Sequence, residues 1–329
     1  MAGNDNKKYV ELLWYQKYDR IDLGEKLPIE KPNLPFQVVE TINKPRLKDL
    51  EKGLFDADKI NPEDKYPPNY PKDWKNLLIW GDNKLVMSYL IKQGWAGKIN
   101  LIYIDPPFFT GADFTVRTKI GDEEIEKEPS IIEERAYKDT WSGGIASYLK
   151  YMYERLVLMR ELLAENGSIY VHLDWHVGHY VKVMMDEIFG YGGEREVPGF
   201  RNEIVWCYTG AGQTPEHFPR KHDCILWYSK TSKYIFNINN LRIPYKKSNI
   251  AAGRTSYTGR KSEEYLLELD RRGKIIEDWW ADIATIGYSH SEILDFTTQK
   301  PEALLKRIIL ASSNECDIVA DFFVVQVLL

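Results

Sequence analysis

Residues 101–108 read Leu-Ile-Tyr-Ile-Asp-Pro-Pro-Phe, an apolar run that ends in a carboxylate, two prolines and an aromatic ring. The apolar run followed by a turn signal predicts a short buried strand over residues 101–104. The prolines keep the residue before them out of the helical region, so Asp105 is expected to be extended and rigid. Because ligands of open α/β sheets bind beyond the carboxyl ends of the strands, the stretch predicts a binding site at Asp105.

The chemistry of this stretch suits an exocyclic amino group. Asp105 and the carbonyl of Pro106 place two hydrogen-bond acceptors side by side. Accepting both amino hydrogens localises the nitrogen lone pair and directs it at an electrophile, while Phe108 offers a ring on which a base can stack. The candidate catalytic residues are therefore Asp105, Pro106, Pro107 and Phe108. Asp-Pro-Pro also occurs in ordinary turns, and the residues alone leave that alternative open.

Strand-like and helical patterns alternate around this stretch, which predicts an α/β fold with a parallel sheet. Strands are expected over residues 77–80, 101–104, 168–173, 202–208 and 223–228. Helices are expected over residues 84–93, 145–164 and 177–189, with a turn at 165–167 after the second helix. Half of the sixteen prolines lie between residues 28 and 71, so an irregular N-terminal arm is expected, with a short helix near 46–54. Seven acids between residues 122 and 134 predict a surface loop.

The composition is that of a folded protein. The 329 residues are 43% hydrophobic and 28% charged, which excludes the disordered, collagen-like and coiled-coil classes. The first ten residues contain no apolar stretch, and no run of about 18 apolar residues follows. Neither a signal peptide nor a membrane span is expected, and the expected location is the cytoplasm. Three cysteines without CxxC spacing argue against a disulfide framework and a zinc ribbon.

The charge is unevenly distributed along the chain. Nine basic residues and one acid lie between residues 217 and 260, so this segment carries +8 and the rest of the chain −13, within a net charge of −5. Such asymmetry predicts a polyanion-binding face on an acidic body. A solvated loop surface is the alternative. The candidate polyanion-binding residues are Arg220, Lys221, Lys246, Lys247, Arg254 and Arg260, which become DNA-binding candidates through the resemblance described next.

Several motifs resemble, in their order, those of the β-group of S-adenosylmethionine-dependent DNA adenine-N6 methyltransferases, particularly the modification subunits of type III restriction systems. Residues 105–108 resemble the catalytic motif, and residues 110–114 with 137–141 resemble the target-base loop. Gly81-Asp82-Asn83 is similar to an element beside the cofactor. The remaining matches lie at residues 166–174, 185–190 and 298–313. The resemblance covers roughly residues 76–323.

The resemblance implies a circularly permuted Rossmann-like class I methyltransferase with a basic target-recognition insert. Its divisions are an irregular N-terminal arm (1–73), a first part of the core (74–207), the insert (208–278) and a second part of the core (279–329). It implies S-adenosylmethionine as cofactor, held by Asp82, Thr298, Lys300, Asp321 and Phe323. The implied substrate is adenine N6 in duplex DNA, reached by base flipping, since aspartate at the first catalytic position favours adenine over cytosine N4.

Partners and alternatives follow from the same resemblance. Members often form homodimers and some pair with a restriction subunit, so both are expectations here. A catalytically dead DNA-binding remnant and an RNA methyltransferase are the alternative functions. The sequence His172-x-Asp174-x-His176 with His179 has metal-ligand spacing. No metal is expected, because the sulfonium of the cofactor already activates its methyl group.

The segment at 298–313 predicts a capped helix by its own pattern. Thr298 is a suitable cap and Pro301 suits the first turn, while Leu304, Leu305, Ile308 and Ile309 give the helix a buried face. The helix N-terminus is expected to hold the carboxylate of the cofactor. An ordinary capped core helix is the alternative.

The C-terminal residues depart from the family pattern. After Phe323 the family has a glycine loop, typically Cys-Gly-Ser-Gly-Thr-Thr, whereas this sequence reads Val-Val-Gln-Val-Leu-Leu. Codons TGT GGT TCA GGT ACT ACT T for the family loop, read one base later, encode that sequence. We therefore expect a frameshift that truncates the chain at this motif and impairs cofactor binding, because valine cannot allow the close backbone approach of glycine. Cys316 also replaces a family glycine.

Overall fold

The structure is a computed structural model that describes residues 12–14, 17, 29, 31–32, 35–38, 74–110, 117–120, 123–126, 141, 143–194, 196–210, 215–244, 263–286, 292 and 299–324. The helices are α1 (Asn83–Leu90), the π-helical turn η4 (Ile91–Trp95), α3 (Gly144–Leu162), α4 (Gly178–Phe189), the 3-10 turn η5 (Ile238–Leu241), α6 (Glu263–Arg272) and α7 (Glu302–Ser312). None of these described helices is both long and apolar enough to cross a membrane.

The described strands form one central sheet and two small ribbons. They are β1 (Ile99–Ile104), β2 (Arg117–Ile120), β3 (Glu123–Glu126), β4 (Leu163–Leu173), β5 (Gly199–Cys207), β6 (His222–Ser229), β7 (Arg242–Ile243), β8 (Lys274–Ile275), β9 (Trp279–Trp280) and β10 (Val319–Ala320). The central sheet has the order β10-β1-β4-β6-β5-β9. Antiparallel β2 and β3 form one ribbon, and antiparallel β7 and β8 form the other.

The direction of the strands defines the edge that carries the site. β1 is parallel to both β10 and β4, and β5 is parallel to β9. β6 runs antiparallel between β4 and β5. The carboxyl ends of β10, β1, β4, β5 and β9 therefore lie together at one edge, here called the carboxyl edge. The connection from β5 to β6 is at this edge as well.

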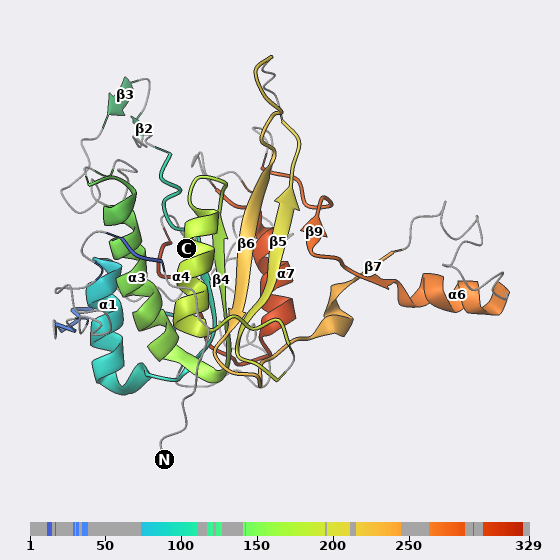
Figure 1. The fold of residues 1–329 in the computed structure, drawn as a ribbon, viewed down its shortest axis with the longest axis horizontal. Helices are drawn as coiled ribbons and strands as arrows, with labels where there is room; N and C mark the ends of the chain where they lie inside the picture. The colour runs from blue at the N-terminus through green and yellow to red at the C-terminus, as the bar shows by residue number, and fades with distance from the viewer. Residues whose placement is uncertain are drawn as a thin grey trace, which may run out of the picture.

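Helices cover both faces of the sheet. Figure 1 shows α1, α3 and α4 on one face and α7 on the other. Ile102 and Ile104 of β1 join the core beneath α1, α3 and α4, whereas Leu101 and Tyr103 join the core beneath α7. A strand buried on both faces is continuously apolar, and this is the pattern of residues 101–104. The α/β class is confirmed.

Two segments, residues 77–80 and residues 165–167, differ from expectation. Residues 77–80 are not a strand; Leu77, Leu78 and Trp80 are exposed and pair with no strand in the described sheet. A short apolar run becomes a strand only where a neighbour supplies backbone hydrogen bonds. The turn expected at 165–167 lies inside β4, where the register with β1 jumps from Ile99–Leu163 to Leu101–Ser168.

The expected helices at 84–93, 145–164 and 177–189 are confirmed as α1 with η4, α3 and α4, and the strands at 101–104, 168–173, 202–208 and 223–228 as β1, β4, β5 and β6. The helix expected near 46–54 lies outside the described residues. Of the acidic stretch 122–134, residues 123–126 form β3 rather than a loop, and the others lie outside the described residues.

The division expected at residue 208 does not coincide with a boundary in the sheet. β6 lies within the expected insert of 208–278, yet it occupies the middle of the central sheet and pairs with both β4 and β5. Its side chains Ile225, Leu226 and Tyr228 are buried in the two cores. The hydrogen bonds and burial of β6 make it part of the core. The other residues of the expected insert precede or follow β6 in the sequence.

Helix α7 differs from its expected form at its N-terminus and on one face. Pro301 is extended and occupies the N-cap position rather than the first turn, and Thr298 lies outside the described residues. The side chain of Glu292 accepts the backbone N–H of Glu302 at 3.1 Å. Leu304 and Ile308 are buried, but Ile309 is 41% exposed, because the sheet covers a narrower stripe of the helix than the apolar pattern suggested.

The described residues of the N-terminal arm pack on the helices. The ring of Trp14 lies edge-on to Tyr153 of α3, with ring centroids 5.5 Å apart. Lys17 Nζ pairs with Glu187 of α4 at 2.6 Å. None of the arm residues that the structure describes is in a helix or strand, so their position depends on these side-chain contacts.

Cys316 adopts a left-handed conformation, with φ of 69°, in the turn before β10. A residue with a Cβ pays about 1–2 kcal/mol to adopt this left-handed conformation, and glycine avoids that cost. Glycine also loses more conformational entropy on folding, which offsets part of the stabilisation. We expect Cys316→Gly to raise the free energy of unfolding by about 0.5–1 kcal/mol, measured by urea denaturation. Cys316→Ala keeps the Cβ and should give no such gain; equal stabilisation by both variants would show that strain is not the cause.

Candidate functional site

The carboxylate of Asp105 lies at the carboxyl edge, directly after β1. Its Oδ2 accepts a hydrogen bond from Lys300 Nζ at 2.7 Å. Its Oδ1 is buried and has no hydrogen-bond partner in the described part of the chain. A buried polar atom without a partner costs about 1–3 kcal/mol, so the state of Oδ1 needs an explanation, and a ligand that donates a hydrogen bond to it is one. Pro106, whose carbonyl is the second expected acceptor, is buried beside it.

Phe108 is held between two polar side chains. Its ring centroid lies 5.9 Å from that of His172, with the planes inclined by 33°. Lys300 Nζ lies 5.2 Å from the same ring centroid. Lys300 therefore contacts both the carboxylate and the aromatic ring of the expected catalytic motif. The next residue, Phe109, has φ of 61°, a left-handed backbone conformation that residues other than glycine rarely adopt.

A buried chain of hydrogen bonds positions His172, on which the ring of Phe108 packs. The Tyr103 hydroxyl and His172 Nδ1 are 2.9 Å apart, and His172 Nε2 lies 3.0 Å from Asp223 Oδ2. The Tyr208 hydroxyl donates to Asp223 Oδ1 at 2.9 Å. This chain joins β1, β4 and β6 and extends to the first residue after β5, so it fixes the relative position of four strands at the site.

The charges around this chain shift two pKa values. Burial would raise the pKa of Asp223, but the hydrogen bonds and charges of His172, Tyr208 and Lys300 together lower the pKa below its ordinary value. Burial, followed by the negative charges of Asp105 and Asp321, raises the pKa of Tyr103 well above its ordinary value. Asp223 is thus ionised and Tyr103 protonated at neutral pH.

The histidines at 172–179 have partners other than a metal. Both ring nitrogens of His172 are engaged by Tyr103 and Asp223. His176 Nδ1 lies 2.6 Å from Asp174 Oδ2, and the ring of His179 packs on Tyr180. Within the described residues no three His, Cys, Asp or Glu side chains are grouped as metal ligands.

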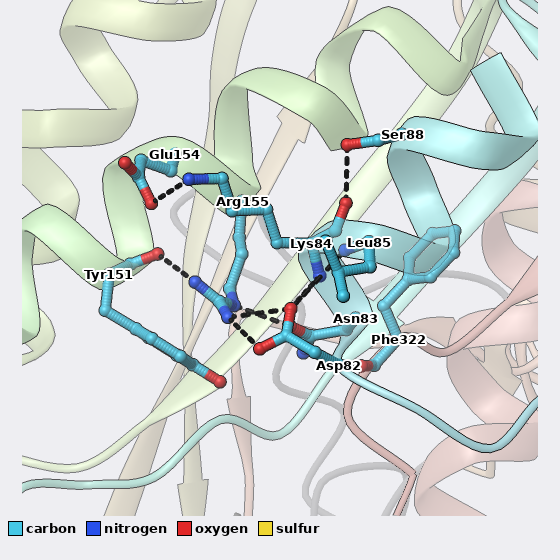
Figure 2. A network of polar contacts seen from close by, with 9 residues as sticks. All are labelled: Asp82, Asn83, Lys84, Leu85, Ser88, Tyr151, Glu154, Arg155 and Phe322. Carbon is cyan, nitrogen blue, oxygen red and sulfur yellow. Dashed lines mark hydrogen bonds and ion pairs between the residues drawn. The ribbon is translucent and has the colours of Figure 1, made fainter. Parts of the chain in front are cut away.

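A second polar network surrounds Asp82 at the start of α1 (Figure 2). Asp82 caps α1 by accepting the backbone N–H of Lys84 at 2.8 Å and of Leu85 at 3.4 Å. Arg155 of α3 reaches Asp82 Oδ2 with Nη2 at 3.2 Å and donates from Nε to Asn83 Oδ1 at 2.5 Å. Its guanidinium also covers the ring of Tyr151, 3.3 Å from the centroid.

The same network reaches the segment after β10. Asn83 Nδ2 donates to the carbonyl oxygen of Phe322 at 2.9 Å, and the ring of Phe323 lies edge-on to Tyr151 at 6.2 Å. Arg155 therefore links the start of α1 to the C-terminal segment through Asn83. Sequence analysis did not identify Arg155. The sequence could have indicated it, because Arg155 is a charged residue within the apolar stripe of α3, between Met152 and Leu156.

The other expected cofactor residues are at separate positions along the carboxyl edge. Asp321 follows β10, and its Oδ1 accepts the backbone N–H of Phe323 at 2.8 Å. Asp321 is exposed at the surface. Desolvation by the surrounding protein and the charge of Asp105 nevertheless raise the pKa of its carboxyl to about 7. Lys300 pairs with Asp105 rather than with the network of Asp82. Thr298 lies outside the described residues.

A cavity of about 330 Å³ borders the network of Asp82. It opens along α3 and is lined by Gly143, Ala146, Ser147, Lys150, Tyr151, Glu154 and Arg155. Tyr151 and Arg155 are shared by the cavity and the network, so the expected cofactor side adjoins an accessible space.

Two of the expected DNA-binding residues are described. Arg220 and Lys221 lie in the connection between β5 and β6, and the guanidinium of Arg220 lies 4.0 Å from the ring centroid of Trp175. Lys246, Lys247, Arg254 and Arg260 lie outside the described residues.

The network predicts a stability difference between two neighbouring cations. Arg155→Met should lower the free energy of unfolding by about 2–3 kcal/mol, because charged hydrogen bonds to Asp82 and Asn83 are lost in a buried place. Lys84→Met removes a half-buried pair with Glu154 and should cost about 1 kcal/mol or less. Urea denaturation of both variants measures the difference; equal losses would contradict the special role of Arg155.

The sequence of the chain is similar to those of known proteins. The model of the DNA methylase family matches residues 99–325. The type II methyltransferase M.EcaI of Enterobacter cloacae is 38% identical over 164 residues, which are 49% of this chain and 31% of that protein. The type II methyltransferase M.BglII of Bacillus subtilis is 32% identical over 280 residues, 84% of this chain and 66% of that protein.

Further matches cover smaller shares or show weaker similarity. The Mod subunit of the type III restriction-modification enzyme EcoP15I of Escherichia coli is 29% identical over 174 residues, 50% of this chain and 26% of that protein. The chain thus spans between about a quarter and two thirds of these relatives. A solved complex of M1.HpyAVI with S-adenosylmethionine has a TM-score of 0.41 at 15% identity, covering 73% of this chain and 78% of that one.

Proposed function

The chain belongs to the DNA methylase family, and from this premise we propose that it transfers a methyl group from S-adenosylmethionine to N6 of adenine in duplex DNA. The observation that carries the proposal is the buried Oδ1 of Asp105, an acceptor without a partner among the described residues, at the carboxyl end of β1. An exocyclic amino group supplies the donor that this oxygen lacks. The type II and type III restriction-modification relatives support the same reaction.

Asp105 and Pro106 orient the amino group in this proposal. Asp105 Oδ1 accepts one amino hydrogen and the carbonyl of Pro106 accepts the other, so the nitrogen lone pair points away from both acceptors. Lys300 holds Oδ2 at 2.7 Å and keeps the carboxylate from rotating. The ring of Phe108, positioned by His172 and Lys300, stacks on the base. Two hydrogen-bond acceptors and a ring thus select a planar base with an amino group.

S-adenosylmethionine supplies a methyl group already activated by a sulfonium. The described residues fit such a molecule by their chemistry: Asp82 and Asp321 suit its ammonium and hydroxyl groups, and Phe323 offers a ring. The cavity along α3 adjoins Asp82 through Arg155. The N-terminus of α7 fits less well, because Glu292 already accepts from Glu302 there. Lys300, at Asp105, acts on the substrate side.

DNA binding is assigned to the basic residues of segment 208–278 outside β6. Arg220 and Lys221 lie at the carboxyl edge and would contact phosphates beside the flipped base. Lys246, Lys247, Arg254 and Arg260 complete the proposed surface. A homodimer and a restriction subunit are the proposed protein partners, since the EcoP15I relative is a subunit of a restriction-modification enzyme. The proposed location is the cytoplasm, as the sequence predicts.

One experiment tests the reaction and its rivals. The chain is incubated with methyl-labelled S-adenosylmethionine and plasmid DNA, and the digested nucleosides are separated by mass spectrometry. Label in N6-methyladenine is the expected result; label in N4-methylcytosine would overturn the base assignment. Transfer to structured RNA but not to plasmid DNA would identify an RNA methyltransferase. Salt-sensitive DNA binding without transfer would identify a DNA-binding remnant.

A further inference from the structure

The connection between β5 and β6 carries an unusual side chain. Phe218 is 94% exposed, more than any other large hydrophobic side chain that the structure describes. Figure 1 shows the described parts of this connection, residues 208–210 and 215–221, extending beyond the ends of β5 and β6, and they are here called the projection. Leaving a phenylalanine in water is unfavourable, so the exposed ring of Phe218 is available to a partner that covers it.

The projection is attached directly to the candidate reacting centre. Tyr208, its first residue, donates to Asp223, and Asp223 is joined to His172, whose ring packs on Phe108. Because β5 is parallel to β4 and β4 to β1, the projection rises from the same edge as Asp105. A partner bound at Asp105 and a partner bound at the projection would therefore both contact this edge of the sheet.

The chemistry around Phe218 favours a polyanion with flat rings. Residues 215–222 contain Arg220 and Lys221 against one acid, Glu216. Arg220 lies 4.0 Å above the ring of Trp175, which is 44% exposed, and Trp175 in turn stacks on His176 at 3.7 Å. Stacking orients the guanidinium while leaving its edge available to phosphate oxygens. Cations beside aromatic rings are the usual combination in surfaces that hold unstacked nucleic acid.

We propose that the projection between β5 and β6 inserts Phe218 into the DNA base stack beside the flipped adenine, with Arg220, braced on Trp175, on the adjoining phosphate. The inference rests on the proposed function, since it requires duplex DNA at Asp105. Flipping a base leaves a gap in the stack and costs pairing energy. An apolar side chain that fills the gap favours the flipped state, as wedge residues do in other DNA-bending proteins.

The test measures unstacking separately from methylation. Plasmid fragments saturated with protein are treated with permanganate, which oxidises unstacked thymines, and methyl transfer is followed on the same DNA. The wild-type chain should increase thymine reactivity. Phe218→Ala should abolish the increase and reduce the transfer rate about tenfold at saturating DNA, whereas Phe218→Leu, which keeps an apolar wedge, should retain most of both. Arg220→Ala should weaken DNA binding and reduce its salt dependence.

Tyr191 provides the matched control. It is an exposed aromatic residue at the opposite edge of the sheet, where it bridges to Gly199 at the start of β5. Tyr191→Ala should change neither readout. Unchanged unstacking and transfer in Phe218→Ala would overturn the wedge while leaving the methyltransferase intact. If the wild-type chain unstacks DNA without transferring methyl groups, the proposed function is wrong but the wedge role of Phe218 is supported. If the wild-type chain does not unstack DNA, the wedge role is wrong.

Discussion

Asp105→Asn is expected to lower the rate of methyl transfer by about 10²–10³-fold, the usual loss when one preorganised polar contact is removed from a reacting centre. The buried Oδ1 of Asp105 is the acceptor proposed for an amino hydrogen. An amide at this position either presents N–H groups to the donor or places its oxygen there without negative charge. Because the contact matters most as the amino nitrogen develops positive charge, kcat should fall while the affinity for S-adenosylmethionine changes little.

The measurement is a steady-state assay with labelled S-adenosylmethionine, together with direct binding of the cofactor to each variant. Asp317→Asn is the control, because Asp317 caps the turn before β10 by accepting the N–H of Asn314, at the amino end of the strand. That variant should transfer methyl groups within about twofold of wild type, since it lies away from the reacting centre. A near wild-type rate for Asp105→Asn would remove Asp105 from the reaction.

Lys17→Met is expected to lower the free energy of unfolding by about 3–5 kcal/mol, because it removes one partner of a buried ion pair. The side chains of Lys17 and Glu187 are 1% and 8% exposed, and their charged atoms are 2.6 Å apart. Lys17 also donates to the carbonyl of Leu12 and lies over the ring of Trp14. One side chain thus attaches the described part of the arm to α4.

A second substitution separates the charge effect from a packing effect. Lys17→Met combined with Glu187→Met removes both charges and should recover most of the loss, because a buried ion pair can be replaced by apolar groups of similar size at little cost. Lys31→Met is the control, since Lys31 and Glu161 are 33% and 36% exposed and their pair should contribute about 1 kcal/mol or less. Urea denaturation compares the variants. Equal losses from Lys17→Met and Lys31→Met would contradict the role of burial.

These two predictions depend on different kinds of information. Asp105 was identified from residues 101–108 alone, because proline geometry and strand burial act over a few residues. The pairing of Lys17 with Glu187 joins positions 170 residues apart and left no local signal. The same is true of Lys300, which contacts Asp105 across 195 residues.

The sequence by itself determined the α/β class, the strand that ends at Asp105, and helices α1, α3 and α4, because each of these is encoded in periodicity and turn chemistry within a short window. Only the tertiary structure decided that residues 77–80 remain unpaired, that β6 lies in the middle of the sheet, and that Arg155 joins Asp82 to Asn83. The physical reason is that a local pattern specifies which side chains avoid water. It does not specify which distant backbone or charge they meet, and that choice depends on the packing of the whole chain.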